Sequence, residues 1–74
     1  MPRLPRITAK QIIYILEKRG FKLVRQSGSH KIYKKSDGKR TTVPFHDGKI
    51  LHPKILKSIL NDAGIEIEEL EKLL

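Results

Sequence analysis

The sequence predicts a single α+β domain over residues 1–74, with the element order α-β-β-β-α and a short extra helix at the C-terminus. Two apolar stripes at helical spacing lie near the ends of the chain, and short runs of strand-type residues lie between them, separated by turns that contain glycine. A chain of 74 residues is long enough for one small domain only. The simplest arrangement is a three-stranded antiparallel sheet with both main helices on one face. The other face of the sheet then stays partly open to solvent.

The first helix is predicted over residues 9–19. Thr8 and Gln11 have the spacing of a capping box, in which the hydroxyl accepts a hydrogen bond from a free backbone amide and the glutamine side chain reaches back. Ile7 and Ile12 flank this cap as a hydrophobic staple. The glycine that follows residue 19 suits the left-handed position just after a helix.

Three short strands are predicted next, over residues 21–26, 30–35 and 40–45. The first two are separated by Ser-Gly-Ser, and the second and third by Ser-Asp-Gly-Lys. An Asp-Gly pair between two strands is typical of a two-residue hairpin turn in which both turn residues have positive φ. Pro44 cannot donate a hydrogen bond to a neighbouring strand, so it is expected near the end of its strand or at an edge.

The second helix is predicted to begin near Pro53, which suits a first helical position, and to end at Gly64. Its apolar stripe consists of Ile55, Leu56, Ile59, Leu60 and Ala63. Residues 66–74 repeat the helical pattern weakly. We interpret this segment as an acidic, solubilising end that packs on the domain through Ile67, Leu70 and Leu74; shielding of a basic surface is the alternative.

The charge is strongly basic and unevenly distributed. There are 16 Lys and Arg against 8 Asp and Glu, for a formal net charge of +8. Residues 1–60 carry +12 and residues 61–74 carry −4. This excess excludes an acidic disordered tail protein and favours an anionic partner such as nucleic acid. The alternative is a solvated basic face that keeps a small protein soluble.

The residues expected to bind nucleic acid lie on the predicted strands and in the turns and loop around them. Cations there would hold phosphates, and a glycine allows close approach of a backbone. The set consists of Arg25, Gly28, Ser29, Lys31, Lys34, Lys35, Lys39, Arg40 and Lys49.

His30 is the strongest candidate for a catalytic residue. An imidazole can give or take a proton near neutral pH, and the lysines that follow it can stabilise charge on a phosphate. Alternation leaves two possibilities for its placement. If Ile32 faces the helices, His30 lies at the rim of that face; if Tyr33 faces them, His30 lies on the open face. The alternative is that His30 is only a polar surface residue.

No metal, cofactor or membrane contact is expected. The chain has no cysteine, and the spacing of its three histidines matches no metal site. We interpret His46 as a turn residue and His52 as a helix cap. No apolar run approaches the roughly 20 residues that cross a bilayer. We therefore expect a cytoplasmic protein.

Several short motifs follow one another in a specific order. They are Gly28-Ser29-His30 before a strand, Val43-Pro44-Phe45-His46, and a helix that ends in Ala63-Gly64-Ile65. In this order they resemble the HicA toxin family, the messenger-RNA interferases of HicAB toxin–antitoxin pairs, and the resemblance covers nearly the whole chain. It implies a fold like the double-stranded RNA-binding domain (dsRBD), a single essential histidine at His30, and a HicB-type antitoxin that covers this surface.

The function expected from these observations is metal-independent cleavage of mRNA by the toxin of a type II toxin–antitoxin pair, with His30 as the catalytic residue. Two alternatives stay open from the residues themselves. One is a non-catalytic RNA-binding module that uses the same basic face. The other is an interaction module for an acidic protein.

Overall fold

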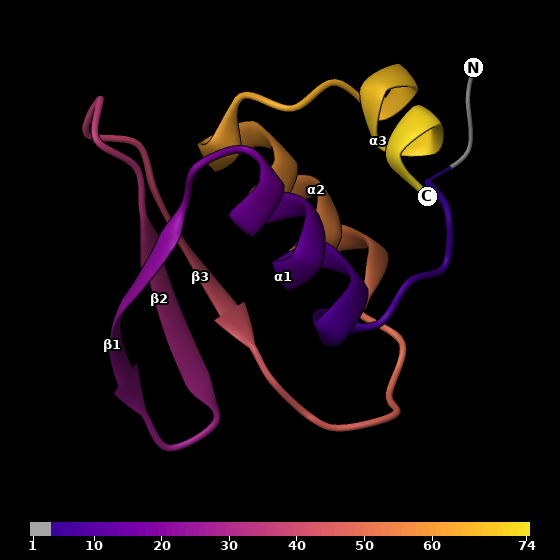
Figure 1. The fold of residues 1–74 in the computed structure, drawn as a ribbon. Coiled ribbons are helices and arrows are strands. Elements are labelled where there is room, and N and C mark those ends of the chain that lie inside the picture. Colours follow the sequence, from indigo (N-terminus) through magenta and orange to yellow (C-terminus); the bar gives the residue numbers. More distant parts are fainter. Residues whose placement is uncertain (1–3) are drawn as a thin grey trace.

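The computed structural model describes residues 4–74 and has the element order α-β-β-β-α-α (Figure 1). Its elements are α1 (Ala9–Lys18), β1 (Lys22–Ser27), β2 (His30–Lys34), β3 (Arg40–Pro44), α2 (Pro53–Ala63) and α3 (Ile67–Leu73). The strands form one antiparallel sheet in the order β1-β2-β3. The α+β class and the short extra helix are confirmed, and the predicted boundaries differ from the observed ones by about a residue, which is within the usual spread of such assignments.

The start of α1 has the predicted capping box. The backbone N–H of Thr8 donates to Oε1 of Gln11 over 2.8 Å, and the backbone N–H of Gln11 donates to the Thr8 hydroxyl over 3.3 Å. Ile7 and Ile12, which flank the cap, are both buried in the core. These contacts satisfy amides that the first helical turn leaves free, and so they set where the helix begins.

α2 also begins and ends at the residues that the sequence indicates. Nδ1 of His52 accepts a hydrogen bond from the backbone N–H of Lys54 over 3.1 Å, which confirms the role of His52 as a cap. Gly64 has φ +69° at the other end, where Ile65 N–H donates to the Leu60 carbonyl over 2.9 Å. The predicted apolar stripe is wrong at Ile55, which is 39% exposed. It lies a quarter-turn from the buried face that its stripe neighbours share.

The turn between β2 and β3 differs from the predicted two-residue turn. Of its residues only Gly38 has positive φ, at +97°. The N–H of Gly38 donates to the Lys35 carbonyl over 3.0 Å, and the N–H of Lys35 donates to the Lys39 carbonyl over 2.8 Å. This is the pattern of a three-residue connection, in which a type I turn precedes one left-handed glycine. Asp37 therefore needs no positive φ, and β2 ends before Lys35.

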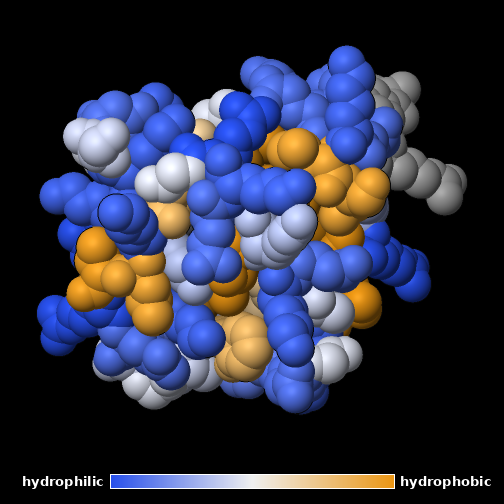
Figure 2. Space-filling view, in the orientation of Figure 1, coloured by the Kyte–Doolittle hydropathy of each residue, from blue (hydrophilic) through white to orange (hydrophobic). Residues whose placement is uncertain are grey.

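The hydrophobic core lies between α1, α2 and one face of β2 and β3. Both helices contact β3, so the sheet is covered mainly at that edge (Figure 1). Side chains that are almost wholly buried there include Ile12, Leu16, Phe21, Val43, Leu56 and Ile59. β1 is exposed along its whole length, and Leu23 and Val24 form an apolar patch on it, 46% and 57% exposed. An apolar patch is visible over the strands in Figure 2.

α3 packs on the domain through two of the three predicted residues, Ile67 and Leu70, with Leu73 in place of Leu74. Leu70 is fully buried, and Ile67 and Leu73 are partly buried against the core. Leu74 is 53% exposed, because the helix ends at Leu73 and the last residue leaves its apolar face. Within residues 4–74, no helix is long and apolar enough to cross a membrane.

Candidate functional site

The burial of Tyr33 decides which face of β2 packs against the helices, a choice that the sequence left open. Its side chain is only 3% exposed, and its neighbours across β3 on the same face, Thr41 and Val43, are also buried. Tyr33 therefore faces the helices. Because side chains alternate along a strand, His30 lies on the open face of the sheet together with Ile32. His30 is exposed there.

The open face carries three rows of side chains, each with one residue from each strand. The rows are Ser27, His30 and Pro44; Arg25, Ile32 and Thr42; and Lys22, Lys34 and Arg40. We call the last of these the basic row. A diagonal step of about 7–8 Å separates Arg25 from His30, which is within reach of an arginine side chain.

A β-bulge in β1 assembles these rows. The register shifts between Leu23 and Arg25, so that Val24 is the extra residue. Simple alternation from Lys22 would put Arg25 on the opposite face. The extra residue corrects for this and brings Lys22 and Arg25 to the same face. Strand pattern alone gives no signal of the bulge, so the sequence does not indicate Lys22 as a member of the candidate site.

His30 is held by the turn that precedes it. Gly28 has φ +57° and Ser29 does not have positive φ, a combination that matches a type II′ hairpin turn with glycine at its first central position. The Ser29 carbonyl accepts a hydrogen bond from the backbone N–H of Phe45 over 2.6 Å, which attaches the turn to β3. The backbone around His30 is thus fixed on two sides, while its imidazole makes no hydrogen bond or ion pair to the described residues.

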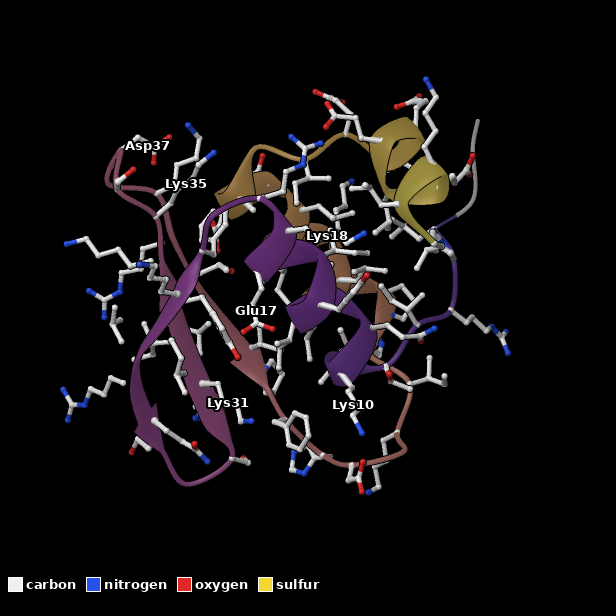
Figure 3. The ribbon with its side chains drawn as sticks, viewed as in Figure 1. Lys10, Glu17, Lys18, Lys31, Lys35 and Asp37 are labelled. Atoms are coloured by element: carbon white, nitrogen blue, oxygen red, sulfur yellow. The ribbon has the colours of Figure 1, made fainter. Side chains whose placement is uncertain are left out.

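The predicted RNA-binding residues do not form one surface. Arg25, Lys34 and Arg40 share the open face with His30. Lys31 and Lys35 alternate to the helical side, where their Nζ atoms lie 4.1 Å from the ring centroid of Phe45 and 5.9 Å from that of Phe21. Figure 3 shows Lys31 extending from β2 on the side of α1. These two lysines therefore cover apolar rings with their cations and do not stand beside the imidazole.

Lys39 and Lys49 lie away from the rows of the open face. Nζ of Lys39 is 3.0 Å from Oδ2 of Asp37, and its side chain runs toward Gly64 at the end of α2. Lys49 is exposed in the loop from β3 to α2, where its N–H donates to the His46 carbonyl over 3.1 Å. That loop leaves the end of β3 and runs beneath α1 (Figure 1).

Tyr33 and Asp37 have perturbed pKa values, and neither side chain belongs to the open face. Burial raises the pKa of Tyr33 above 10.0, and the nearby negative charge of Glu17 adds to this effect. Figure 3 shows Glu17 between α1 and the sheet. Hydrogen bonds from the backbone and side chain of Lys39 lower the pKa of Asp37 below 3.8. Tyr33 therefore stays protonated as a core residue, and Asp37 stays ionised as a turn residue.

The open face thus combines an accessible imidazole with four cations, Lys22, Arg25, Lys34 and Arg40. The cations of this face could bind phosphate groups, and its imidazole could transfer protons near neutral pH. Within residues 4–74, no three His, Cys, Asp or Glu side chains are grouped closely enough to hold a metal ion.

Comparison with known proteins identifies a family for most of the chain. A family model described as HicA toxin of bacterial toxin–antitoxin matches residues 9–65. The matched segment runs from the start of α1 to the residue after the cap of α2, and it includes all three strands and every residue of the open-face rows. No curated protein matches the chain.

Proposed function

Because the chain belongs to the HicA toxin family of bacterial toxin–antitoxin systems, we propose that it cleaves messenger RNA and that His30 is its catalytic residue. The observation that carries this proposal is the placement of His30. It lies on the uncovered face of the sheet, held in place by the hairpin turn, with its imidazole free and Arg25 one diagonal step away. The chain's other two histidines lie outside the strands, His46 in the loop after β3 and His52 at the start of α2.

The proposed reaction uses a group that RNA itself supplies. The ribose 2′-oxygen attacks the neighbouring phosphorus, an O–P bond forms, and the bond from phosphorus to the 5′-oxygen of the next nucleotide breaks. The products are a 2′,3′-cyclic phosphate and a free 5′-hydroxyl. His30 either takes the proton of the attacking hydroxyl or gives one to the leaving oxygen, and water exchanges the other proton.

Charge on the reacting phosphate is stabilised by the cation nearest to the imidazole. Arg25 is that cation, and a guanidinium can donate two parallel hydrogen bonds to phosphate oxygens. One positioned proton-transfer group contributes about 10²–10⁴-fold in rate. A slow enzyme is sufficient for a toxin, since each cut inactivates one message.

We also propose that the antitoxin partner is a HicB-type protein that covers the open face. The face is basic and exposed, so an acidic surface would complement it and exclude RNA at the same time. Inhibition and substrate binding then compete for the same side chains.

The test is cleavage of a mixed RNA transcript by the wild-type protein and by His30→Ala, followed on a denaturing gel. We expect cleavage to fall by at least about 10²-fold in the variant, because the proton-transfer group is removed. His46→Ala is the matched control, since this histidine is exposed in the loop after β3 and outside the strands, and it should cleave as the wild type does. Circular dichroism melting checks that each variant is folded.

Three outcomes would contradict the proposal in different ways. Equal cleavage by wild type and His30→Ala would assign the chemistry to another group or to a contaminant. Loss in both histidine variants would indicate a site that extends into the loop. RNA binding without cleavage by any protein would favour a non-catalytic RNA-binding module.

The reaction should not need a divalent ion, because the nucleophile comes from the RNA and the proton transfer from an imidazole. We expect the same RNA products and rate in excess EDTA as in its absence. A DNA of the same sequence should stay intact, since it lacks the 2′-hydroxyl. Loss of cleavage in EDTA, with recovery on adding Mg²⁺, would overturn the metal-independent reaction.

A further inference from the structure

The basic row is an unusual feature of the open face. Lys34 is paired directly with Lys22 on one side and with Arg40 on the other. Residues directly opposite each other on one face have Cβ atoms about 4.5–5.5 Å apart, and like charges at that spacing are destabilising. All three side chains are exposed. The sheet therefore carries a local repulsion that an anionic ligand would relieve.

No acidic side chain of the described residues neutralises this row. The ion pairs within residues 4–74 join Arg19 to Glu69 and Lys39 to Asp37. Asp37 lies in the hairpin next to the row, yet its carboxylate already accepts the Lys39 backbone N–H over 2.9 Å and contacts the Lys39 amine. The acidic residues of α3 lie with that helix, on the far side of the domain from β1 (Figure 1).

The row is also aligned with the candidate catalytic residue. His30, Ile32 and Lys34 alternate along the open face of β2, so that the row lies two side-chain positions beyond His30. Four residues of extended strand span about 13 Å. That separation is too long for Lys34 to contact the phosphate on which His30 acts, but it suits a phosphate farther along the same strand of RNA.

We propose that the row formed by Lys22, Lys34 and Arg40 is a phosphate subsite, which holds a single-stranded RNA segment along β2 with its scissile bond at His30. The inference rests on the proposed function for the position of the scissile bond. Between the two ends, Ile32 offers an apolar surface that suits an unstacked base. The row contributes binding and not chemistry, because it does not reach the reacting atoms.

Single-stranded RNA fits this face better than a duplex does. The sheet is three strands wide, or about 10 Å between its outer strands at the usual strand spacing. A single strand can lie along β2 and bring its bases to Ile32. In a duplex the bases are stacked and paired, so only the backbone is available to side chains of this kind.

The binding test uses a labelled single-stranded RNA oligonucleotide and protein in which His30→Ala prevents cleavage. In that background, K22Q, K34Q and R40Q are combined in one protein, the row variant. It is compared with a control triple variant that carries K10Q, K18Q and K57Q. The control removes the same charge from exposed positions on the helices. Fluorescence anisotropy gives each Kd, and thermal melting checks folding; the row variant should melt at the same temperature or higher, because its repulsion is gone.

We expect the row variant to lose at least about tenfold in affinity at moderate salt and the control triple less than about threefold. The slope of log K against log salt should fall in magnitude by about 2 for the row variant, as three phosphate contacts with single-stranded RNA predict. Annealing the oligonucleotide to its complement should weaken binding. Equal losses in both triples, or tighter binding of the duplex, would overturn the inference.

Kinetics of the active protein separate this inference from the proposed function. With His30 intact, the row variant should raise KM by the same factor as Kd and leave kcat within about twofold, as expected for a contact made equally in the ground and transition states. A fall in kcat alone would overturn the subsite. If the wild-type protein cleaves no RNA, the proposed function fails, while the difference in Kd between the two triples still decides the subsite.

Discussion

Among single residues, the side chains of β2 show that the face on which a residue lies decides whether it serves the core or the candidate site. Tyr33 is buried under the helices and has a raised pKa, whereas His30, three positions earlier, is exposed and free. Lys31 is next to His30 in sequence, yet it covers the Phe45 ring on the opposite face. Neighbours in sequence are therefore poor guides to neighbours in the site, and Arg25 is the cation that the fold brings toward the imidazole.

Asp37 gives a prediction at this scale for the dependence of stability on pH. Its folded-state pKa is lowered below 3.8 by two hydrogen bonds from Lys39, so its ionised form stabilises the folded state. That contribution is present above pH 3.8 and is lost as the pH falls through the folded-state pKa. Urea unfolding of wild type and Asp37→Asn should show a larger difference in stability at pH 6 than at a pH below 3.8. A difference that is the same at both pH values would contradict this account.

At the scale of elements, α3 is part of the domain and not a loose acidic end. Leu70 is fully buried, and Glu69 pairs with Arg19 just past the end of α1. These contacts hold α3 at the end of the helical layer (Figure 1). The interpretation of residues 66–74 as a shield for the basic surface is not supported, because α3 lies far from the open face of the sheet.

The prediction for this element is that Leu70→Ala destabilises the domain by about 2–5 kcal/mol, as large-to-small changes in a core do. A small domain has only about 5–15 kcal/mol in total, so truncation after Ile65 should abolish cooperative melting. Leu74→Ala is the control, because that side chain is 53% exposed and should change stability by less than about 0.5 kcal/mol. Cooperative melting of the truncated chain at an unchanged temperature would show that α3 is dispensable.

At the scale of the whole molecule, the two faces of the sheet have different tasks. The helices cover one face and supply nearly all of the core, while the other carries an imidazole and four cations that make no ion pair to the described residues. The helix-covered face of the sheet thus serves stability, and the open face is the candidate surface for binding. Changes on the open face should therefore alter RNA binding with little effect on folding.

The net charge of +8 leads to a prediction for binding as a whole. Contacts from the four open-face cations, Lys22, Arg25, Lys34 and Arg40, predict a slope of about −3 for log K against log salt on single-stranded RNA. Titrations of a short oligonucleotide between 50 and about 300 mM salt would measure it. A slope near zero would contradict the assignment of this face to phosphate binding and would favour an interaction module for a protein.

The elements and their caps could be predicted from the sequence alone. Those features depend on contacts between residues that are close in the sequence, such as Thr8 with Gln11 and the N–H of Ile65 with the Leu60 carbonyl. Contacts of this kind can be predicted from the order of the residues. The turn at Asp37 was the exception, because Asp-Gly suits two kinds of hairpin connection.

Which side chains share a face could be learned only from the folded structure. Alternation gave two phases for β2, and the burial of Tyr33 under the helices chose between them. The bulge at Val24 then placed Lys22 and Arg25 together, and the pairing of β2 with both neighbours completed the basic row. Register is set by how the whole sheet buries one face against the helices, and no local pattern contains that information.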